Sequence, residues 1–322
     1  MRRFFDPFIG LLLLTIALAT LLPASGAAAQ WVGFVATAAV VFLFFVHGVR
    51  LPREHLIAAV GHWRLHGTIL AFTYAVFPLL VFLLRLAVPS LLPDPLWIGV
   101  LFLSALPSTV QSSIAMVSVA RGNVAASVAS AAMSNLLGIA LTPALLGVLA
   151  QTQGGGVNFS GVWKIVLQLL LPFALGHALR PWLGAWAARQ KATLAYTDRA
   201  TIILAVYSAF SAAVLGGIWR QVPLSRLLVL VALCALILGL MLLGLRTTAR
   251  ALGFSKDDEI PILFCGLQKS LVSGVPMARV LFAGPAVGAA VLPVMIYHQM
   301  QLMVCAWLAR RYANRAGAPL EE

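Results

Sequence analysis

Two apolar stretches of the sequence are interrupted by polar residues that could hold a small charged molecule. Residues 106–113 read Leu-Pro-Ser-Thr-Val-Gln-Ser-Ser, and residues 264–270 read Phe-Cys-Gly-Leu-Gln-Lys-Ser. Hydroxyl, amide and ammonium groups can bind ions and anionic substrates. Non-helical backbone at membrane depth is tolerated only where it is buried in protein or lines a water-filled cavity. A simple proline or serine kink would explain one such stretch. Two of them favour a functional site at mid-membrane, where the two interrupted helices cross each other (the crossing).

Lys269 has the strongest chemical implication, because it lies near the centre of its apolar run. An unpaired charge at that depth costs at least about 2.5–3.5 kcal/mol. Snorkelling of the side chain to the interface is the alternative. We expect the ammonium to lie in the crossing, hydrogen-bonded to hydroxyls and opened carbonyls. All nine acidic residues fall at termini, in loops or at the ends of apolar runs, so no mid-membrane carboxylate is available to bind a cation or carry a proton.

This arrangement favours an anionic ligand. Helices that begin near Ser112 and Ser270 would point their positive dipole ends at mid-membrane, a suitable position for a carboxylate or sulfate. His298 is either a packing histidine or a proton carrier, and proton coupling through Lys269 also stays open. The residues expected to contact the substrate are Thr109, Gln111, Gln268, Lys269, His298 and Gln299.

The composition sets the class of protein that must position these residues. The chain has 322 residues, 61% hydrophobic and only 10% charged, and its mean hydropathy is +0.99. A soluble domain is about a quarter charged, so we predict an all-α polytopic membrane protein, with the lipid bilayer as its surroundings. At about 20 residues per crossing, the apolar runs predict ten spans, at 7–23, 31–49, 66–88, 96–120, 123–149, 162–180, 197–218, 224–249, 258–282 and 285–309.

The net charge of +13 does not indicate nucleic-acid binding, because the basic residues stand singly or in pairs between apolar runs. With the N-terminus inside, 16 of the 22 Lys and Arg residues fall on the cytoplasmic side and 3 on the other, while 3 lie within spans. Because short cytoplasmic loops are enriched in basic residues, we expect both termini in the cytoplasm and the chain in the inner membrane. The start resembles a signal peptide, but Asp6-Pro7 interrupts it, so we expect the first span to be retained.

The chain also resembles itself. Residues 111–114, Gln-Ser-Ser-Ile, recur as residues 268–271, Gln-Lys-Ser-Leu, at an offset of 157. We therefore divide the chain into halves 1–161 and 162–322. Because each half has an odd number of spans, the two must be oppositely oriented, as in inverted-repeat transporters whose sites lie where the repeats meet.

Three motifs relate the sequence to a known family: Ala120-Arg121-Gly122-Asn123-Val124-Ala125, Cys265-Gly266-Leu267-Gln268-Lys269-Ser270 with Gly274, Pro276 and Met277 behind it, and Tyr297-His298-Gln299. In these motifs the chain resembles the bile acid/sodium symporter family, in particular its SBF-like orphan branch, which includes a vertebrate homologue of unsettled activity. The resemblance covers essentially the whole chain. It implies a panel domain of spans 1, 2, 6 and 7 that rocks against a core domain of spans 3–5 and 8–10, with discontinuous spans 4 and 9 crossing in the core.

The sodium sites of that family are matched only in part. Ser112, Ser113 and Ser127 match ligands of one ion, but a second hydroxyl position in span 5 is Ala131. For the other ion Gln268 matches, whereas a glutamate position is Phe264, a glutamine position falls near Thr73, and the asparagine after the span-9 glutamine is Lys269. Gln299 matches a family asparagine that faces the crevice. The resemblance thus implies ion-site equivalents at Ser112, Ser113, Ser127, Gln268 and Lys269, with the lysine in the place of an ion.

The function predicted from these observations is secondary transport of a small organic anion by alternating access, without the usual coupling to two sodium ions. The anion could be bile-acid-like, a carboxylate or a sulfated compound. A sodium-coupled symporter with an altered site and a non-transporting regulator of ion or calcium homeostasis stay open. A membrane enzyme is disfavoured because the sequence has no intramembrane acidic pair and no GxSxG motif. No metal site or organic cofactor is expected, and the oligomeric state cannot be read.

Overall fold

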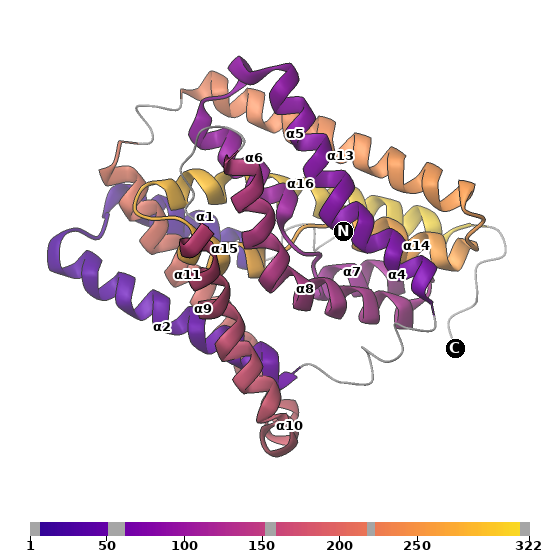
Figure 1. Cartoon of the computed structure of the whole chain (residues 1–322), viewed down its shortest axis with the longest axis horizontal. Helices are drawn as coiled ribbons and strands as arrows, with labels where there is room; N and C mark the ends of the chain where they lie inside the picture. Colours follow the sequence, from indigo (N-terminus) through magenta and orange to yellow (C-terminus); the bar gives the residue numbers. More distant parts are fainter. Residues whose placement is uncertain (1–6, 51–61, 152–158, 218–222, 316–322) are drawn as a thin grey trace.

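The computed structural model describes residues 7–50, 62–151, 159–217 and 223–315, and every regular element in these ranges is helical (Figure 1). The all-α prediction is therefore confirmed for this part of the chain. The helices of the first part are α1 (Pro7–Leu21), α2 (Gly26–Arg50), α4 (Trp63–Ala71), the π-helix η1 (Phe72–Val76), α5 (Phe77–Ala87), the 3₁₀ turn η2 (Pro89–Leu91), α6 (Asp94–Ala105), α7 (Gln111–Val119) and α8 (Val124–Gln151).

The second part continues with helices of similar length. They are α9 (Phe159–Ala178), α10 (Arg180–Arg189), α11 (Lys191–Leu215), α13 (Leu224–Ala251), α14 (Lys256–Leu267), α15 (Leu271–Leu281) and α16 (Ala286–Ala313). Helix α10 lies in a segment that the sequence analysis had treated as a connecting loop. The predicted boundary between the halves, after residue 161, falls inside α9.

Seven stretches of the described chain are long and apolar enough to cross a membrane, which supports a multi-pass membrane protein. They are Gly26–Arg50, Trp63–Ala87, Val124–Leu149, Lys191–Leu215, Leu224–Ala251, Lys256–Leu281 and Ala286–Ala313. Shorter apolar stretches, at Gly10–Leu21, Asp94–Ala105 and Leu169–Ala178, lie at the other three predicted spans. Ten crossings and inverted halves therefore stay predictions.

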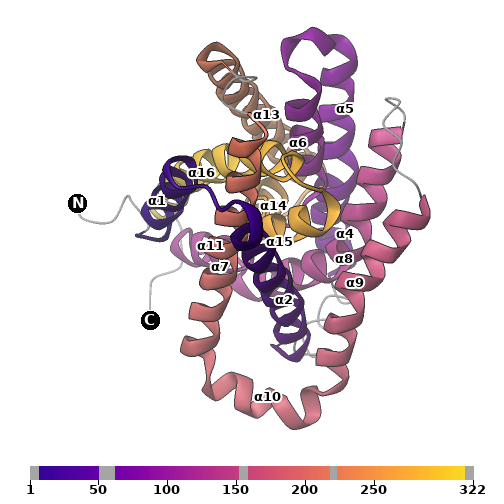
Figure 2. The same cartoon turned by 90° about the vertical axis from the view of Figure 1, so that its left-hand side faces the viewer.

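The helices pack in two groups. Helix α2 packs on α9 and α11, and α1 packs on α11. In the second group, α16 packs on α6, α13 and α15, while α14 contacts α4, α7, α8 and α13. Helix α11 joins the groups by packing on α15 and α16, as does α9 by packing on α8. Figure 2 shows α10 bridging α9 and α11 at one end of the molecule.

The two interrupted helices lie at the centre of the second group. Helix α6 ends at Ala105 and α7 begins at Gln111, whereas α14 ends at Leu267 and α15 begins at Leu271. The interruptions lie where the sequence predicted them. The backbone N–H of Ser270 donates to the carbonyl of Pro107 at 2.9 Å, so the two breaks touch. The span Lys256–Leu281 is 94% enclosed by protein, against 33–50% for the other six, which makes it the innermost element.

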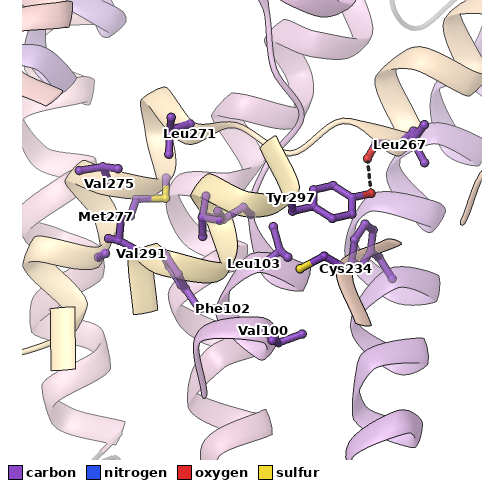
Figure 3. Close-up of a cluster of buried hydrophobic side chains, with 14 of the residues drawn as sticks. Val100, Phe102, Leu103, Cys234, Leu267, Leu271, Val275, Met277, Val291 and Tyr297 are labelled. Carbon is purple, nitrogen blue, oxygen red and sulfur yellow. Dashed lines mark hydrogen bonds between the residues drawn. The ribbon is translucent and has the colours of Figure 1, made fainter. Parts of the chain in front are cut away.

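Apolar side chains surround the second break and fix its position. Figure 3 shows Leu271, Val275 and Met277 of α15 among side chains of α6, α13 and α16. In the same view the hydroxyl of Tyr297 points at the end of α14 and donates to the carbonyl of Leu267 at 3.0 Å. Because the last carbonyls of a helix lack partners within it, this bond stabilises the chain where α14 stops.

Candidate functional site

The first part of the site is a cluster of side-chain oxygens that joins the two breaks. The Oε1 atom of Gln268 accepts hydrogen bonds from the hydroxyls of Thr109 at 2.5 Å, Ser112 at 2.6 Å and Ser113 at 3.3 Å. Thr109 Oγ1 also lies 2.7 Å from the Ser112 hydroxyl and 2.8 Å from that of Ser113. The structure thus brings together Thr109 of the first break, Ser112 and Ser113 at the start of α7, and Gln268 of the second break.

The start of α7 makes one side of this cluster accessible. Gln111 is exposed, Val110 is 40% exposed and Ser112 is half-buried, whereas Thr109 and Gln268 are buried. Val110, the N-cap residue of α7, makes no side-chain capping hydrogen bond. The first backbone N–H groups of the helix and the positive end of its dipole therefore remain available to an anion. Helix α15 differs, because the Ser270 hydroxyl accepts the Ser273 N–H at its N-terminus and the surrounding residues are buried.

The other end of the Gln268 amide is left without a good acceptor. Its Nε2 atom is buried and makes no hydrogen bond to oxygen or nitrogen in the described part of the chain, and the neighbouring Cys305 thiol is only a weak acceptor. A buried polar group without a partner costs about 1–3 kcal/mol. A buried donor that has only a weak acceptor is chemically suited to an incoming acceptor.

The second part of the site is the ammonium of Lys269, which is completely buried. Its Nζ donates to three backbone carbonyls: Thr73 at 2.8 Å, Ser104 at 2.7 Å and Leu106 at 2.9 Å. An ammonium has three N–H donors, so these bonds use all of them. The expectation that hydroxyls would share this role is wrong for the described residues, since every acceptor is a main-chain oxygen.

Local backbone geometry explains why these carbonyls are available. Ser104 and Leu106 lie at the end of α6, where helix carbonyls lack partners and carry the negative end of the dipole. The carbonyl of Ala105 between them accepts a hydrogen bond from the Thr142 hydroxyl at 2.8 Å. Thr73 lies in the π-helix η1, where the usual hydrogen-bond ladder is interrupted. The ammonium therefore completes the hydrogen bonding of a broken helix and of a π-helix together.

Aromatic rings enclose the same ammonium. Lys269 Nζ lies 4.4 Å from the ring centre of Phe77 and 6.0 Å from that of Tyr74. Both distances are within the range of cation–π attraction. The sequence analysis placed Lys269 among the substrate contacts. In this conformation its ammonium reaches no accessible surface, so it stabilises the crossing from within.

The backbone of Lys269 is held as firmly as its side chain. Gln301 Oε1 accepts the Lys269 N–H at 2.7 Å, and Gln301 Nε2 donates to the Lys269 carbonyl at 2.9 Å. His298 Nδ1 lies 3.1 Å from the same carbonyl. His298 thus joins the site through the contact of its imidazole with the Lys269 carbonyl. Gln299 is half-buried and makes no side-chain hydrogen bond in the described chain.

Helix α8 supports the first break but contributes less directly than expected. Ser134 Oγ accepts the Ser108 N–H at 3.0 Å, and Asn135 Nδ2 donates to the Ser108 carbonyl at 2.8 Å. Ser127, predicted as an ion-site equivalent, lies apart from the Gln268 cluster, with its hydroxyl 3.3 Å from the Cys265 sulfur. Of the other four predicted equivalents, Ser112, Ser113 and Gln268 are hydrogen-bonded together. The ammonium of Lys269 instead binds backbone carbonyls.

The acidic residues of the described ranges all have partners away from Lys269. The distances from a carboxylate oxygen to the partner nitrogen are 2.5–3.0 Å. The partners are cationic side chains, except for Asp258, whose partner is a side-chain amide. The pairs are Asp94 with Arg85, Asp198 with Arg50, Asp257 with Arg315, Asp258 with Asn123, and Glu259 with Lys256. The dipoles of carbonyls, rather than a carboxylate, therefore stabilise the buried ammonium.

The sequence analysis missed two contributors to the site. Gln301 lies one helical turn after His298 on α16, and this spacing could have indicated that the two side chains share a face. The carbonyl of Thr73 could not have been found, because a π-helix leaves no clear mark in a run such as Phe-Thr-Tyr-Ala-Val.

Several known proteins are similar to this chain over most of its length. An uncharacterised protein of Pseudomonas aeruginosa is 51% identical over 98% of this chain and 96% of its own length. YfeH of Escherichia coli (strain K12), a proposed symporter, is 48% identical over 97% of this chain and 94% of its own. Sodium/bile acid cotransporter 7 of Rattus norvegicus is 29% identical over 83% of this chain and 79% of its own.

These relatives are named as transporters where they carry a functional name, and none of those names is that of an enzyme. Residues 6–314, nearly the whole chain, match the SBF-like CPA transporter family. The resemblance drawn from the motifs around Arg121, Gln268 and His298 is thereby confirmed. The chain is a membrane transporter that belongs to the SBF-like CPA transporter family.

Proposed function

We propose that this chain is a secondary transporter of a small organic anion that works by alternating access without coupling to two sodium ions. It lies in the inner membrane with both termini in the cytoplasm, and its ten spans form two inverted halves. The substrate is a bile-acid-like compound, a carboxylate or a sulfated metabolite. The proposal rests on the two parts of the site. One is an accessible anion-binding position at the start of α7 (the anion seat), and the other is the buried ammonium of Lys269.

The observation that carries the proposal is the set of partners of Lys269. In transporters with discontinuous helices, unwound carbonyls and the C-terminal ends of half-helices coordinate the coupling cation. Here the end of α6 and the π-helix η1 present three carbonyls at 2.7–2.9 Å to a covalently attached ammonium. A sodium ion added at this point would meet a like charge in a low-dielectric site. The lysine thus supplies the charge that stabilises the crossing, and no ion is needed there.

The anion seat lies at the start of α7. An uncapped helix N-terminus provides backbone N–H donors and a positive potential. The hydroxyl of Ser112 and the amide of Gln268 border it, and Gln111 is exposed beside it. Within the described ranges, no carboxylate is hydrogen-bonded to this cluster, so an anionic group would meet no like charge there.

Contacts between the two groups of helices favour an inward-facing state. Arg279 Nη2 donates to the carbonyl of Gly33 at 3.2 Å, Gly288 packs against Ala213, and Gly216 packs against Pro285. In the proposed topology all three contacts lie toward the outer side. Rocking of the groups would break them and open the site outward.

Uptake by purified protein in liposomes tests this function. We expect a labelled organic anion to be taken up at the same initial rate in sodium and in choline, and Ser112→Ala or Gln268→Ala to reduce that rate. Ser118→Ala is the matched control, because Ser118 is exposed on the same helix. Parent rates in both site variants would place the substrate elsewhere. Collapse of a pH gradient with a protonophore separates proton-coupled uptake from uncoupled uptake.

A second candidate is symport with a single sodium ion, and the oxygen cluster around Gln268 favours it. Four side-chain oxygens, from Thr109, Ser112, Ser113 and Gln268, meet within hydrogen-bond distance of one another. Oxygen donors suit a hard cation. In that case uptake would depend on sodium with a stoichiometry of one, and Ser113→Ala would abolish the dependence while Lys269 stays in place.

A further inference from the structure

A groove between α2 and α10 lies outside the site described above. Its volume is about 240 Å³. The residues that line it come from the end of α2 and from α10, and all are apolar: Phe42, Phe45, Val46, Val49, Leu183, Trp186 and Ala187. A wall without polar groups cannot orient a water-soluble ligand by hydrogen bonds. The occupant must therefore be an apolar chain.

The groove lies at the boundary of the membrane. Its α2 residues form the last two turns of an apolar span that ends at Arg50. Helix α10 is separated from α9 by Leu179 alone and from α11 by Gln190 alone, so it must lie where those two helices end. Figure 2 shows α10 crossing between them at the end of the molecule. In the proposed topology, one side of the groove would face lipid tails and the other would face head groups.

The exposed side chains of α10 are of the kind found at that depth. Trp182 is 74% exposed and Trp186 is 43% exposed. Tryptophan is enriched where tails meet head groups, and a helix that presents aromatic and basic residues lies in the plane of that interface. Helix α10 therefore fits a position in the lipid interface, with Trp186 both lining the groove and facing the bilayer.

The charges next to the groove are positive. Arg189 at the end of α10 and Lys191 at the start of α11 are exposed, and residues 179–197 contain no acidic residue. The next acidic residue, Asp198, is neutralised by Arg50 at 2.7 Å. A basic surface beside an apolar groove matches a molecule with an apolar chain and a negatively charged end.

We propose that the groove between α2 and α10 binds an anionic phospholipid. One acyl chain lies between the side chains of Phe42, Val46 and Leu183, and the phosphate head group lies near Arg189 and Lys191. Juxtamembrane basic residues attract anionic lipids, and the apolar groove adds a fixed position for the chain. The site is distinct from the Gln268 cluster, so it would tie transport activity or stability to the lipid composition of the membrane.

Photo-crosslinking in nanodiscs tests this proposal directly. The full-length protein is placed in phosphatidylcholine discs that contain a trace of either phosphatidylglycerol or phosphatidylcholine, each with the same diazirine-bearing acyl chain. We expect phosphatidylglycerol to label residues 42–49 and 183–187 about tenfold more than phosphatidylcholine does. Leu83 and Leu86, which are 52% and 55% exposed on α5, provide the reference for lipids that contact the protein without a site. They should be labelled equally by both probes.

Charge variants separate a lipid site from general lipid contact. The double variant Arg189→Gln/Lys191→Gln should bring labelling of the groove by the two probes to parity. The control Arg246→Gln/Arg311→Gln removes the same charge from exposed residues near the ends of α13 and α16, and it should leave the preference unchanged. Equal labelling of the groove by both probes in the unmodified protein would overturn the proposal. So would no labelling there, crosslinks between two copies of the chain at this groove, or a preference that survives the double variant.

Discussion

The side-chain amide of Gln301 brackets the peptide group of Lys269. Its Oε1 accepts the lysine N–H at 2.7 Å and its Nε2 donates to the lysine carbonyl at 2.9 Å. Lys269 lies in the break between α14 and α15, where helical hydrogen bonding has stopped. One side chain of α16 thus replaces two bonds that a continuous helix would have made within itself, and it fixes the position from which the lysine ammonium reaches three carbonyls.

Replacing Gln301 should therefore destabilise the fold. Gln301→Leu leaves the buried N–H of Lys269 without its partner and weakens the hydrogen bonding of its carbonyl, at a cost of about 1–3 kcal/mol. The measurement is the unfolding midpoint of the detergent-purified protein, followed by intrinsic fluorescence, and we expect it to fall. Gln299→Leu is the matched control, since Gln299 is half-buried two residues earlier and makes no side-chain hydrogen bond in the described ranges. An equal effect of both variants would show that the two hydrogen bonds from Gln301 to the Lys269 backbone make no specific contribution to stability.

The contact between α2 and α9 predicts a second loss of stability. A Cβ atom added at Gly176 would collide with the carbonyl oxygen of Phe45, so the two helix backbones are in direct contact there. Small residues allow such close approach in membranes. Gly176→Val should lower the unfolding midpoint, because overpacking costs about 1–3 kcal/mol. At Gly67, where an added Cβ meets nothing within 4 Å, Gly67→Val should have a much smaller effect. If Gly176→Val left the midpoint unchanged, the close contact would be wrong.

The orientation of the chain can be tested with single cysteines. Ala188 of α10 and Ser90 of η2 are both exposed, and the positive-inside pattern puts them on opposite sides of the membrane. A membrane-impermeant thiol reagent added to intact cells should label Ser90→Cys and should label Ala188→Cys only after the cells are opened. The unmodified protein is the background control, because its three cysteines are buried. Efficient labelling of Ala188→Cys from outside would reverse the topology.

The sequence could predict the site to the extent that chemistry is visible in side chains. The helix interruptions follow from Pro107, Gly266 and the polar residues around them, and Lys269 stood out because it is a charge in an apolar run. What the sequence could not show is where main-chain atoms lie. The acceptors of Lys269 are carbonyls of Thr73, Ser104 and Leu106, and these become available through a π-helix and a helix end.

The fold shows the same limit. The apolar runs predicted the helices, and their ends agree with the structure within a few residues at α8 and α13. Helix α10 was missed because its ten residues contain Pro181, Gly184 and two arginines, a composition that also suits a loop. Its position between α9 and α11 depends on tertiary packing, which local composition does not report.

The central claim is that Lys269 occupies the place of a coupling cation, and the sodium dependence of stability tests it without knowledge of the substrate. A ligand that binds only the folded state stabilises it by RT ln(1 + L/Kd), where L is the ligand concentration, so the unfolding midpoint rises as the ligand concentration exceeds its Kd. The midpoint of the unmodified protein should stay constant when choline chloride is replaced stepwise by sodium chloride at fixed ionic strength. Lys269→Ala should have a lower midpoint that rises with sodium as the ion enters the vacated carbonyl site. A rise of the unfolding midpoint with sodium in the unmodified protein, of the size seen in Lys269→Ala, would contradict the account.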